Sequence, residues 1–328
     1  MDVVLAQPRG FCAGVVRAID IVERALTQYG APVYVYHDIV HNAHVVAALR
    51  KRGAIFVDEI SAISAGAVTV FSAHGVADAI RAEALQRGLH IIDATCPLVE
   101  KVHAHARRYA RSGAQIVLIG HAGHDEVVGT QGVSDQPMLV VGSVADVSRL
   151  QIRPGQRVAY VTQTTLSVDD TREIIEALRA RFPAIEGPAT DDICYATQNR
   201  QNGVRALAAR VDLILVVGDS HSSNASRLQE LAAQSGCRSH LIEDAARIDP
   251  AWLVGVGTVG VTAGASTPDF LVQGVCHRLG GLGLTRISEL PGVQESVVFR
   301  LPDEVAGPRR PPPDRSTPRA VPRAVARS

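Results

Sequence analysis

Three times along the chain, a short run of residues ends in a cysteine that opens a helical segment, and this repetition constrains the fold more than any other feature. The runs are VVLAQPRGFCAG at Cys12, HIIDATCPLV at Cys96 and DDICYATQ at Cys194. In each third, a later apolar run delivers polar residues 28 or 29 positions after the cysteine, at His41, His124 and Ser222. Because such runs alternate with helical-length segments, the pattern predicts an α/β fold with largely parallel strands.

The repetition also predicts how the chain is divided. Its 328 residues exceed the size of one ordinary domain. We expect three similar α/β units around a shared centre, namely residues 1–96, 97–193, and 194–306 with a C-terminal closing segment. A third run in each unit ends in polar residues, at His74, Thr164 and Ser266. Because ligands of parallel sheets bind beyond the carboxyl ends of the strands, one crevice can collect these ends from all three units.

Two of the helices can be bounded from the sequence. After Cys12, apolar residues recur every three or four positions up to Gly30, which predicts a helix with one buried face that ends there. After Cys96, Pro97 takes a favoured first helical position and Gly113 marks the end. Both cysteines are therefore expected at the starts of helices.

Charge and hydropathy narrow the class of protein. Basic and acidic residues balance at 33 each, but residues 307–328 hold six Arg, six Pro and one Asp, which predicts a disordered Pro/Arg-rich tail. No apolar run approaches the roughly 20 residues of a membrane-spanning helix, and Met1 to Arg9 lack the features of a secretory signal. We therefore expect a cytoplasmic protein without a membrane or nucleic-acid partner. Its five widely spaced cysteines are not expected to form a disulfide framework.

The three repeated cysteines suit a soft metal centre. Thiolates are stabilised at helix N-termini. The chain contains no C-x-x-C pair, so a local zinc knuckle is not expected. Cys12, Cys96 and Cys194 from three equivalent units could hold three irons of a [4Fe-4S] cluster and leave the fourth open to substrate as a Lewis acid. The alternative is that they are small buried hydrophobic residues. Cys237 and Cys276 lack equivalent places and are interpreted as packing residues.

The polar residues at the strand ends suit an anion. His41, His74 and His124 each follow a strand, and the other candidates are Ser222, Ser223, Asn224 and Ser266. Together they offer imidazole, hydroxyl and backbone N–H donors, as a phosphate or diphosphate would require. For Ser266, in the sequence STPD, a helix N-cap is an alternative that can coexist with ligand contact.

An acidic residue accompanies this set. Glu126, in the turn HAGHDEVVG, is placed pointing inward as a general acid, with Thr164 near enough to relay a proton. The alternative for Glu126 is a helix-start acid, which is the preferred interpretation of Asp125 beside it.

A glycine motif near the C-terminus carries no cofactor prediction. Gly255, Gly257 and Gly260 spell G-x-G-x-x-G, but they lie before and within a strand-like run, and no acidic residue follows about 20 positions later. The chain also lacks a G-x-x-x-x-G-K-[ST] motif. Dinucleotide binding and P-loop ATPase activity are therefore not expected.

Nine segments together resemble one family. They are QPRGFCAGVVRAI, HNAHVV, SAHGV, DATCPLV, GHAGHDEVVGTQG, VTQTTLSVDDT, DDICYATQNRQ, SHSSNASRL and TAGASTPD. In this order they resemble the LytB/IspH family of 4-hydroxy-3-methylbut-2-enyl diphosphate reductases, over residues 1 to about 305. The resemblance implies a trefoil of three α/β units around a central iron–sulfur cluster. It also implies a two-electron reductive dehydroxylation that yields isopentenyl and dimethylallyl diphosphate, the last step of the methylerythritol phosphate route to isoprenoids.

The resemblance also implies roles for single residues. The cluster would be held by Cys12, Cys96 and Cys194, and Glu126 with Thr164 would deliver a proton to the departing hydroxyl. The substrate's diphosphate would be bound by His41, His74, His124, Thr164, Ser222, Ser223, Asn224 and Ser266. Electrons would come from a ferredoxin or flavodoxin-type protein.

Two other functions stay open on the residues alone. One is a cluster-dependent hydro-lyase that removes water without net reduction. The other is a non-enzymatic cluster or zinc protein that senses or binds anions.

Overall fold

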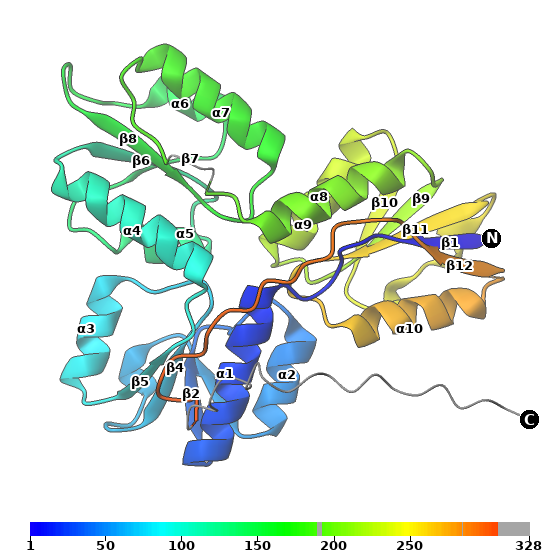
Figure 1. Ribbon diagram of the computed structural model, residues 1–328, viewed down its shortest axis with the longest axis horizontal. Coiled ribbons are helices and arrows are strands. Elements are labelled where there is room, and N and C mark those ends of the chain that lie inside the picture. Colours follow the sequence, from blue (N-terminus) through cyan, green and yellow to red (C-terminus); the bar gives the residue numbers. More distant parts are fainter. Residues whose placement is uncertain (189–191, 284, 308–328) are drawn as a thin grey trace, which may run out of the picture.

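The computed structural model describes residues 1–188, 192–283 and 285–307. It contains three separate parallel sheets, each with its own helices, and forms three lobes around a common centre (Figure 1). This confirms the predicted α/β class with three units. Apart from residue 307, the predicted tail lies outside the described residues.

The first lobe has a four-stranded sheet in the order β3-β2-β4-β5. Its strands are β2 (Val33–Tyr36), β3 (Ala54–Val57), β4 (Val68–Phe71) and β5 (His90–Asp93). Its helices are α1 (Ala13–Tyr29), α2 (Ala43–Lys51), α3 (Asp78–Gln86) and the 3₁₀ turn η1 (Ile60–Ala62). As predicted, α1 buries one face, which includes Val15, Val22 and Leu26, and it ends at Gly30 with φ 78°.

The second lobe has a three-stranded sheet in the order β7-β6-β8. Its strands are β6 (Gln115–Ile119), β7 (Leu139–Val141) and β8 (Val158–Thr162). Its helices are α4 (Pro97–Arg111), α5 (Asp125–Gln131), α6 (Val144–Arg149) and α7 (Val168–Arg181). Alternate residues of β6 enter two different cores: Ile116 and Leu118 pack with α4, whereas Val117 and Ile119 pack with α7. Helices therefore cover both faces of this sheet, as in other parallel sheets.

The third lobe has a five-stranded sheet in the order β10-β9-β11-β1-β12. Its strands are β1 (Asp2–Leu5), β9 (Leu213–Val217), β10 (Arg238–Ile242), β11 (Thr258–Ala263) and β12 (Arg286–Glu289). Its helices are α8 (Tyr195–Ala208), α9 (Ser223–Gln234), α10 (Asp269–Gly280) and the 3₁₀ turns η2 (Ala245–Arg247) and η3 (Pro250–Leu253). The strand β1 falls in the predicted unit 1–96, yet it lies between β11 and β12. An apolar run shows that a strand exists but does not identify the strand with which it pairs.

Each repeated cysteine lies where the chain passes between lobes. The chain leaves β1 of the third lobe and reaches Cys12 before α1 of the first, and it leaves β5 of the first lobe and reaches Cys96 before α4 of the second. Before Cys194 and α8, Glu186 still bridges Ala159 of β8 in the second lobe. We propose residues 96 and 194 as the unit boundaries for this reason.

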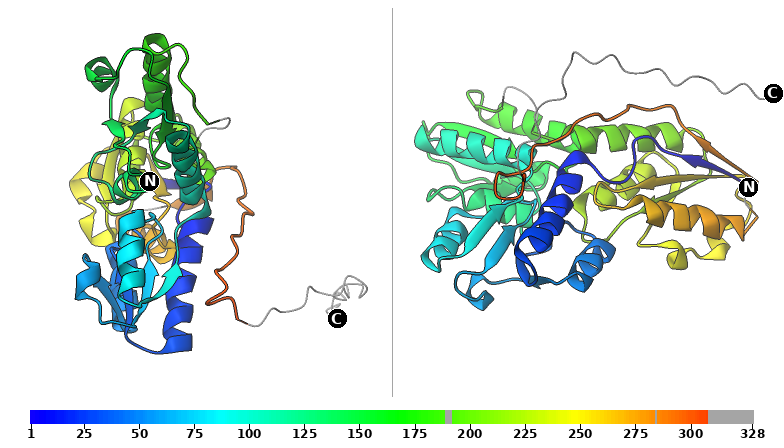
Figure 2. Two further views of the ribbon diagram at one scale, coloured as in Figure 1. Left: turned by 90° about the vertical axis from the view of Figure 1, so that its left-hand side faces the viewer. Right: turned by 60° about the horizontal axis from the view of Figure 1, so that its bottom comes forward.

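A C-terminal strap, residues 290–306, ties the third lobe to the first. It starts beside β1, where the Leu290 N–H donates to the Leu5 carbonyl at 2.9 Å. It then passes outside α1 (Figures 1 and 2). The Arg17 side chain donates to the Arg300 carbonyl at 2.8 Å, and the Tyr29 hydroxyl donates to the Glu304 carbonyl at 3.0 Å. Both lobes are therefore joined by a segment without regular secondary structure.

A buried arginine holds the strap near the centre. Arg200 of α8 has no exposed surface, and its guanidinium donates to the Gly10 carbonyl at 2.7 Å and to the Ala196 carbonyl at 2.8 Å. It also forms an ion pair with Glu295 of the strap at 3.1 Å. One side chain therefore joins the segment before Cys12, the start of α8 and the strap.

Among the described residues, no helix combines the length and apolar character needed to cross a membrane.

We expect Arg200→Met to lower the free energy of unfolding by about 3 kcal/mol, because it leaves the buried Gly10 carbonyl and the Glu295 carboxylate without their partner. Arg286→Met is the matched control, since Arg286 is 74% exposed where it pairs with Asp2 and should contribute less than about 1 kcal/mol. Urea unfolding of both variants measures the difference. Equal losses would contradict a special role for the buried pair.

Candidate active site at the meeting point of the three lobes

One central cavity is lined by a cysteine from the start of each lobe. Cys12, Cys96 and Cys194 are the N-cap residues of α1, α4 and α8, and all three line the cavity. Gly14 allows the first two to approach, because a Cβ at that position would lie 2.7 Å from the Cys96 Sγ. The fold therefore brings together the three thiols that the sequence repeat singled out.

Burial disfavours free thiolates in this cavity. It raises the pKa of Cys96 to about 12 and the pKa of Cys194 to about 11, and the neighbouring cysteines add to both shifts. Helix N–H groups act in the opposite direction, and the Thr197 N–H lies 3.3 Å from the Cys194 Sγ. Among the described residues, no Lys or Arg lines the cavity. A metal centre would therefore have to supply the positive charge that ionises these thiols.

The sulfur atoms are spaced too widely for one metal ion. In the described part of the chain, one group of three ligand atoms lies within 4.8 Å of one another, and it consists of His41, His74 and Asp125 rather than the cysteines. Thiolates around a single tetrahedral zinc ion would lie roughly 3.8 Å apart, given Zn–S bonds of about 2.3 Å. The three thiols therefore fit a cluster of several metal ions better than zinc.

The two remaining cysteines lie elsewhere. Cys237 is buried in a core of the third lobe, and Cys276 packs against another core of that lobe. Neither lines the central cavity.

The same cavity also carries donors for an anion. This anion wall, drawn from all three lobes, comprises His41, His74, His124, Ser222, Ser223, Asn224 and Ser266. The Nε2 atoms of His41 and His124 are buried and have no hydrogen-bond partner. Buried polar atoms are normally paired, so these two nitrogens indicate a place for a ligand.

The three imidazoles are packed against one another. The rings of His41 and His74 stack with centroids 4.1 Å apart, and His124 meets His41 edge-on at 5.2 Å. Burial lowers the pKa of His41, takes the pKa of His74 well below its ordinary value, and brings the pKa of His124 to about 4. The imidazoles are therefore largely neutral near neutral pH, and a bound anion would favour their protonation.

Two of the serines also join lobes, whereas the asparagine bonds within the third lobe. The Ser266 hydroxyl donates to the His41 carbonyl at 2.9 Å, and the Thr165 hydroxyl donates to the Ser223 Oγ at 3.1 Å. The side-chain carbonyl of Asn224 accepts a hydrogen bond from the Ala265 N–H at 2.9 Å. The N-cap of α10 is Pro268, so the alternative N-cap interpretation of Ser266 is wrong, because the helix begins two residues later than the STPD pattern suggested.

Glu126 and Thr164 form a buried pair. The Thr164 N–H and hydroxyl donate to the two oxygens of the Glu126 carboxyl group at 2.6 and 2.9 Å. Burial raises the pKa of Glu126 to about 7, even though both hydrogen bonds act to lower it. A carboxyl group with such a pKa can be protonated near neutral pH and donate a proton into the cavity.

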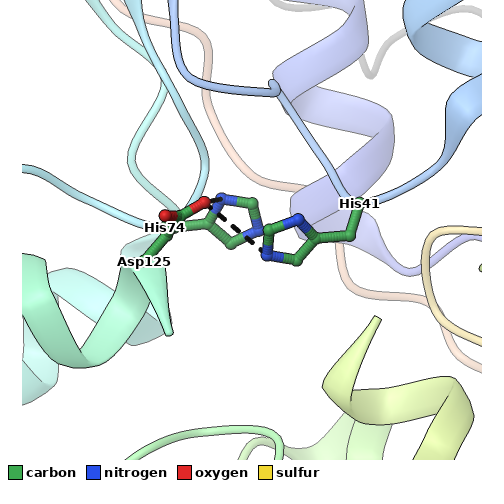
Figure 3. Close-up of side chains that lie close together, drawn as sticks. All are labelled: His41, His74 and Asp125. Carbon is green, nitrogen blue, oxygen red and sulfur yellow. Dashed lines mark ion pairs between the residues drawn. The ribbon is translucent and has the colours of Figure 1, made fainter. Parts of the chain in front are cut away.

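Other residues at the site escaped the sequence analysis. Thr197 contacts the Cys194 sulfur, and its position three residues after an N-cap is a local signal that could have identified it. Phe299 lines the cavity from the strap, and nothing in its sequence surroundings indicates this. Asp125 begins α5, as expected of a helix-start acid, but its carboxylate also faces His41 and His74 (Figure 3).

Fold and site together define a three-lobed α/β protein whose central cavity combines three thiols, a group of imidazole, hydroxyl and amide side chains, and a buried carboxyl group. The family model described as LytB protein matches residues 3–280. The chain belongs to this family, which confirms the resemblance found in the sequence.

Relatives and solved structures agree with this assignment. A protein from Zymomonas mobilis is 56% identical over 302 residues, which cover 92% of this chain and 89% of that protein. A protein from Stenotrophomonas maltophilia strain R551-3 is 57% identical over 310 residues, which cover 93% of this chain and 98% of that protein. Both are named 4-hydroxy-3-methylbut-2-enyl diphosphate reductase.

Two solved structures are similar. The E-1-hydroxy-2-methyl-but-2-enyl-4-diphosphate reductase from Plasmodium falciparum is 38% identical with a TM-score of 0.90, and the match covers 93% of this chain and 96% of that one. A second structure, described as (E)-4-hydroxy-3-methyl-but-2-enyl diphosphate reductase, the terminal enzyme of the non-mevalonate pathway, is 31% identical with a TM-score of 0.61. That match covers 86% of this chain and 100% of the other.

We expect Glu126→Gln to gain stability relative to the unsubstituted chain as pH rises from about 5 to 8. The pKa of Glu126 is raised from 4.5 to about 7 in the folded chain, so between these values the unfolded chain loses this proton first and unfolding becomes easier. The full penalty, on the order of 3 kcal/mol, applies above pH 7, and the uncharged amide of the variant carries none of it. Urea unfolding across this pH range measures it, with Glu173→Gln at an exposed position of α7 as the control. Parallel pH curves for the Glu126 and Glu173 variants would contradict the raised pKa.

Proposed function

We propose that this chain reduces (E)-4-hydroxy-3-methylbut-2-enyl diphosphate to isopentenyl and dimethylallyl diphosphate, the terminal step of the non-mevalonate isoprenoid pathway. The reaction consumes two electrons and two protons, breaks the bond between C4 and its hydroxyl, and releases water. The observation that carries the proposal is the buried Glu126–Thr164 pair in a cavity with three thiols and an anion wall. A cytoplasmic location, expected from the sequence, remains a prediction.

We propose that Cys12, Cys96 and Cys194 hold one [4Fe-4S] cluster with one open iron. Their wide spacing, their placement at three helix N-termini and the tight approach at Gly14 support this. When bound, the cluster supplies the electrons and a Lewis-acidic iron.

The anion wall would position the substrate. Its diphosphate carries the charge, whereas its five-carbon chain offers little but apolar surface, so orientation depends on the diphosphate end. The buried, unpartnered Nε2 atoms of His41 and His124 are donors that a diphosphate would satisfy. The hydroxyls of Ser222, Ser223 and Ser266 and the side chain of Asn224 would complete the site, with Thr164 at its inner edge.

Glu126 would supply a proton to the departing hydroxyl. Hydroxide is a poor leaving group, and protonation lets the oxygen depart as water. The Thr164 N–H and hydroxyl hold the carboxyl group in one orientation. The absence of solvent around this side chain, which is 2% exposed, prevents water from replacing it as the acid.

The electrons would come from a ferredoxin or flavodoxin-type protein, because the sequence has no dinucleotide fingerprint. Cys12 lines both the central cavity and a second groove, formed by α1 and the strap. Cys12 is therefore a residue shared by the substrate cavity and this groove, which makes the groove a candidate route for the electrons. Turnover that requires no reductant would instead favour the hydro-lyase alternative.

We expect the anaerobically purified protein to carry about four irons per chain, and Cys96→Ser to lose most of them, because each proposed ligand holds one corner of the cluster. Cys237→Ser and Cys276→Ser are matched controls from the cores of the third lobe and should keep their full iron content. Iron and sulfide analysis of the unsubstituted protein and the three variants tests this prediction. A full cluster in the Cys96 variant would remove that residue from the ligand set.

We expect Glu126→Gln to lower turnover by about 10² to 10⁴, because the amide keeps the shape of the side chain but cannot donate the acidic proton. Iron content and substrate affinity should stay close to those of the unsubstituted enzyme. Turnover of the unsubstituted enzyme should also fall above pH 7 as the Glu126 carboxyl group ionises, whereas the residual turnover of the variant should not show this decline. Near-normal turnover in the variant would exclude Glu126 as the proton donor.

A further inference from the structure

An acidic side chain lies directly behind the anion wall. The Asp125 Oδ2 lies 3.8 Å from His41 Nε2 and 3.9 Å from His74 Nδ1 (Figure 3). Its Oδ1 lies 3.8 Å from His37 Nδ1. The carboxylate is 28% exposed and does not line the central cavity. A negative charge therefore faces the nitrogens that are expected to bind a diphosphate.

The geometry argues against two simpler roles for Asp125. Distances of 3.8 to 3.9 Å are too long for hydrogen bonds, so the carboxylate does not fix the imidazoles in one orientation. A metal ion shared with His41 and His74 is equally disfavoured, because their planes differ by only 18°. Lone pairs of two stacked rings run side by side and do not converge on one ion. The remaining effect of the carboxylate is its charge.

We propose that Asp125 sets the affinity of the anion wall by weakening its hold on the diphosphate group that substrate and products share. This inference rests on the proposed function, which places the diphosphate against His41, His74 and His124. Asp125 touches none of the reacting atoms, so it acts through the imidazoles and through the electrostatic potential of the pocket.

The direction of the effect follows from charge. A carboxylate near an anion site repels a diphosphate, and it also attracts protons to the imidazoles, which offsets part of that repulsion. The repulsion exceeds this offset, because a diphosphate group carries several negative charges whereas each protonated imidazole carries a single positive charge. Removing the charge should therefore tighten diphosphate binding.

Weaker binding has a use in this reaction. The products keep the diphosphate and lose only the hydroxyl, so the anion wall holds product as firmly as substrate. Interactions that are equally strong with substrate and product lower KM and slow product release, but they do not speed the chemical step. A nearby negative charge shortens the time for which the product occupies the site.

The test compares Asp125→Asn with the unsubstituted, cluster-loaded enzyme. We expect inorganic diphosphate to bind about three- to thirty-fold more tightly to the variant, allowing for screening at a partly exposed site. Product inhibition by isopentenyl diphosphate should strengthen, and KM should fall, by similar factors. Asp58→Asn is the matched control: Asp58 is 93% exposed and lies 3.9 Å from His37, but it has no contact with His41 or His74 in the described structure. It should change each constant by less than about twofold.

The outcomes separate this inference from the proposed function. Unchanged or weaker diphosphate binding in Asp125→Asn, with an unchanged melting temperature, would overturn the role of Asp125. If Asp125→Asn has a lower melting temperature, Asp125→Ser serves as a second variant, because serine also suits a helix start. Asp125→Ser must then bind diphosphate more tightly, and its failure to do so also overturns the inference. His41→Ala tests the proposed function itself. If diphosphate binds to His41→Ala as tightly as to the unsubstituted enzyme, the assignment of the anion wall is wrong. That conclusion holds whatever the result for the Asp125 variants.

Discussion

Three helix N-termini, one from each lobe, point into the same cavity, and the rest of the structure depends on how they are held there. Each N-terminus carries partial positive charge from unpaired N–H groups, so three of them facing one another repel unless negative charge lies between them. The cysteines at the N-caps of α1, α4 and α8 can provide that charge as thiolates. Burial raises the pKa of Cys96 and Cys194, so this happens only with a cationic partner at the centre. The proposed metal centre would in this sense also stabilise the meeting of the three lobes.

The cavity is polar but close to uncharged before a substrate arrives. Burial lowers the pKa of His74 and His124 and raises the pKa of Glu126, so the imidazoles lose their protons and the carboxyl group is partly protonated near neutral pH. A diphosphate in the cavity would favour the protonated form of both kinds of group, which makes the imidazoles cationic and keeps the carboxyl group neutral. The same physical cause, removal of water, therefore prepares both ends of the site for different tasks.

The sequence repeat predicted the cysteines, the anion wall and the Glu126–Thr164 pair because each lies near a boundary between strand and helix, where local pattern is informative. It did not predict the contacts made over long distances in the chain. Arg200 and Glu295 lie 95 residues apart and meet only because the strap crosses α8. The place of β1 in the third sheet is another example, since its four residues show only that a strand exists. Periodicity identifies the buried face of an element but not the partner against which that face packs.

The residues that line the central cavity come from all three lobes, so their relative positions depend on how the lobes meet. His41 and His74 belong to the first lobe, Glu126 and Thr164 to the second, and the serines with Asn224 to the third. The first two lobes meet closely: a Cβ on Gly129 of α5 would lie 2.9 Å from the Gly75 carbonyl, one residue after His74. No side chain other than hydrogen fits there without displacing backbone, so the helix that carries Glu126 is set directly against the loop that carries His74. The distance between Glu126 and His74 is thus fixed by backbone contact. The third lobe meets these two lobes through backbone hydrogen bonds, such as that from the Cys12 N–H to the Ala265 carbonyl at 3.1 Å, and through side chains, such as Thr165 with Ser223.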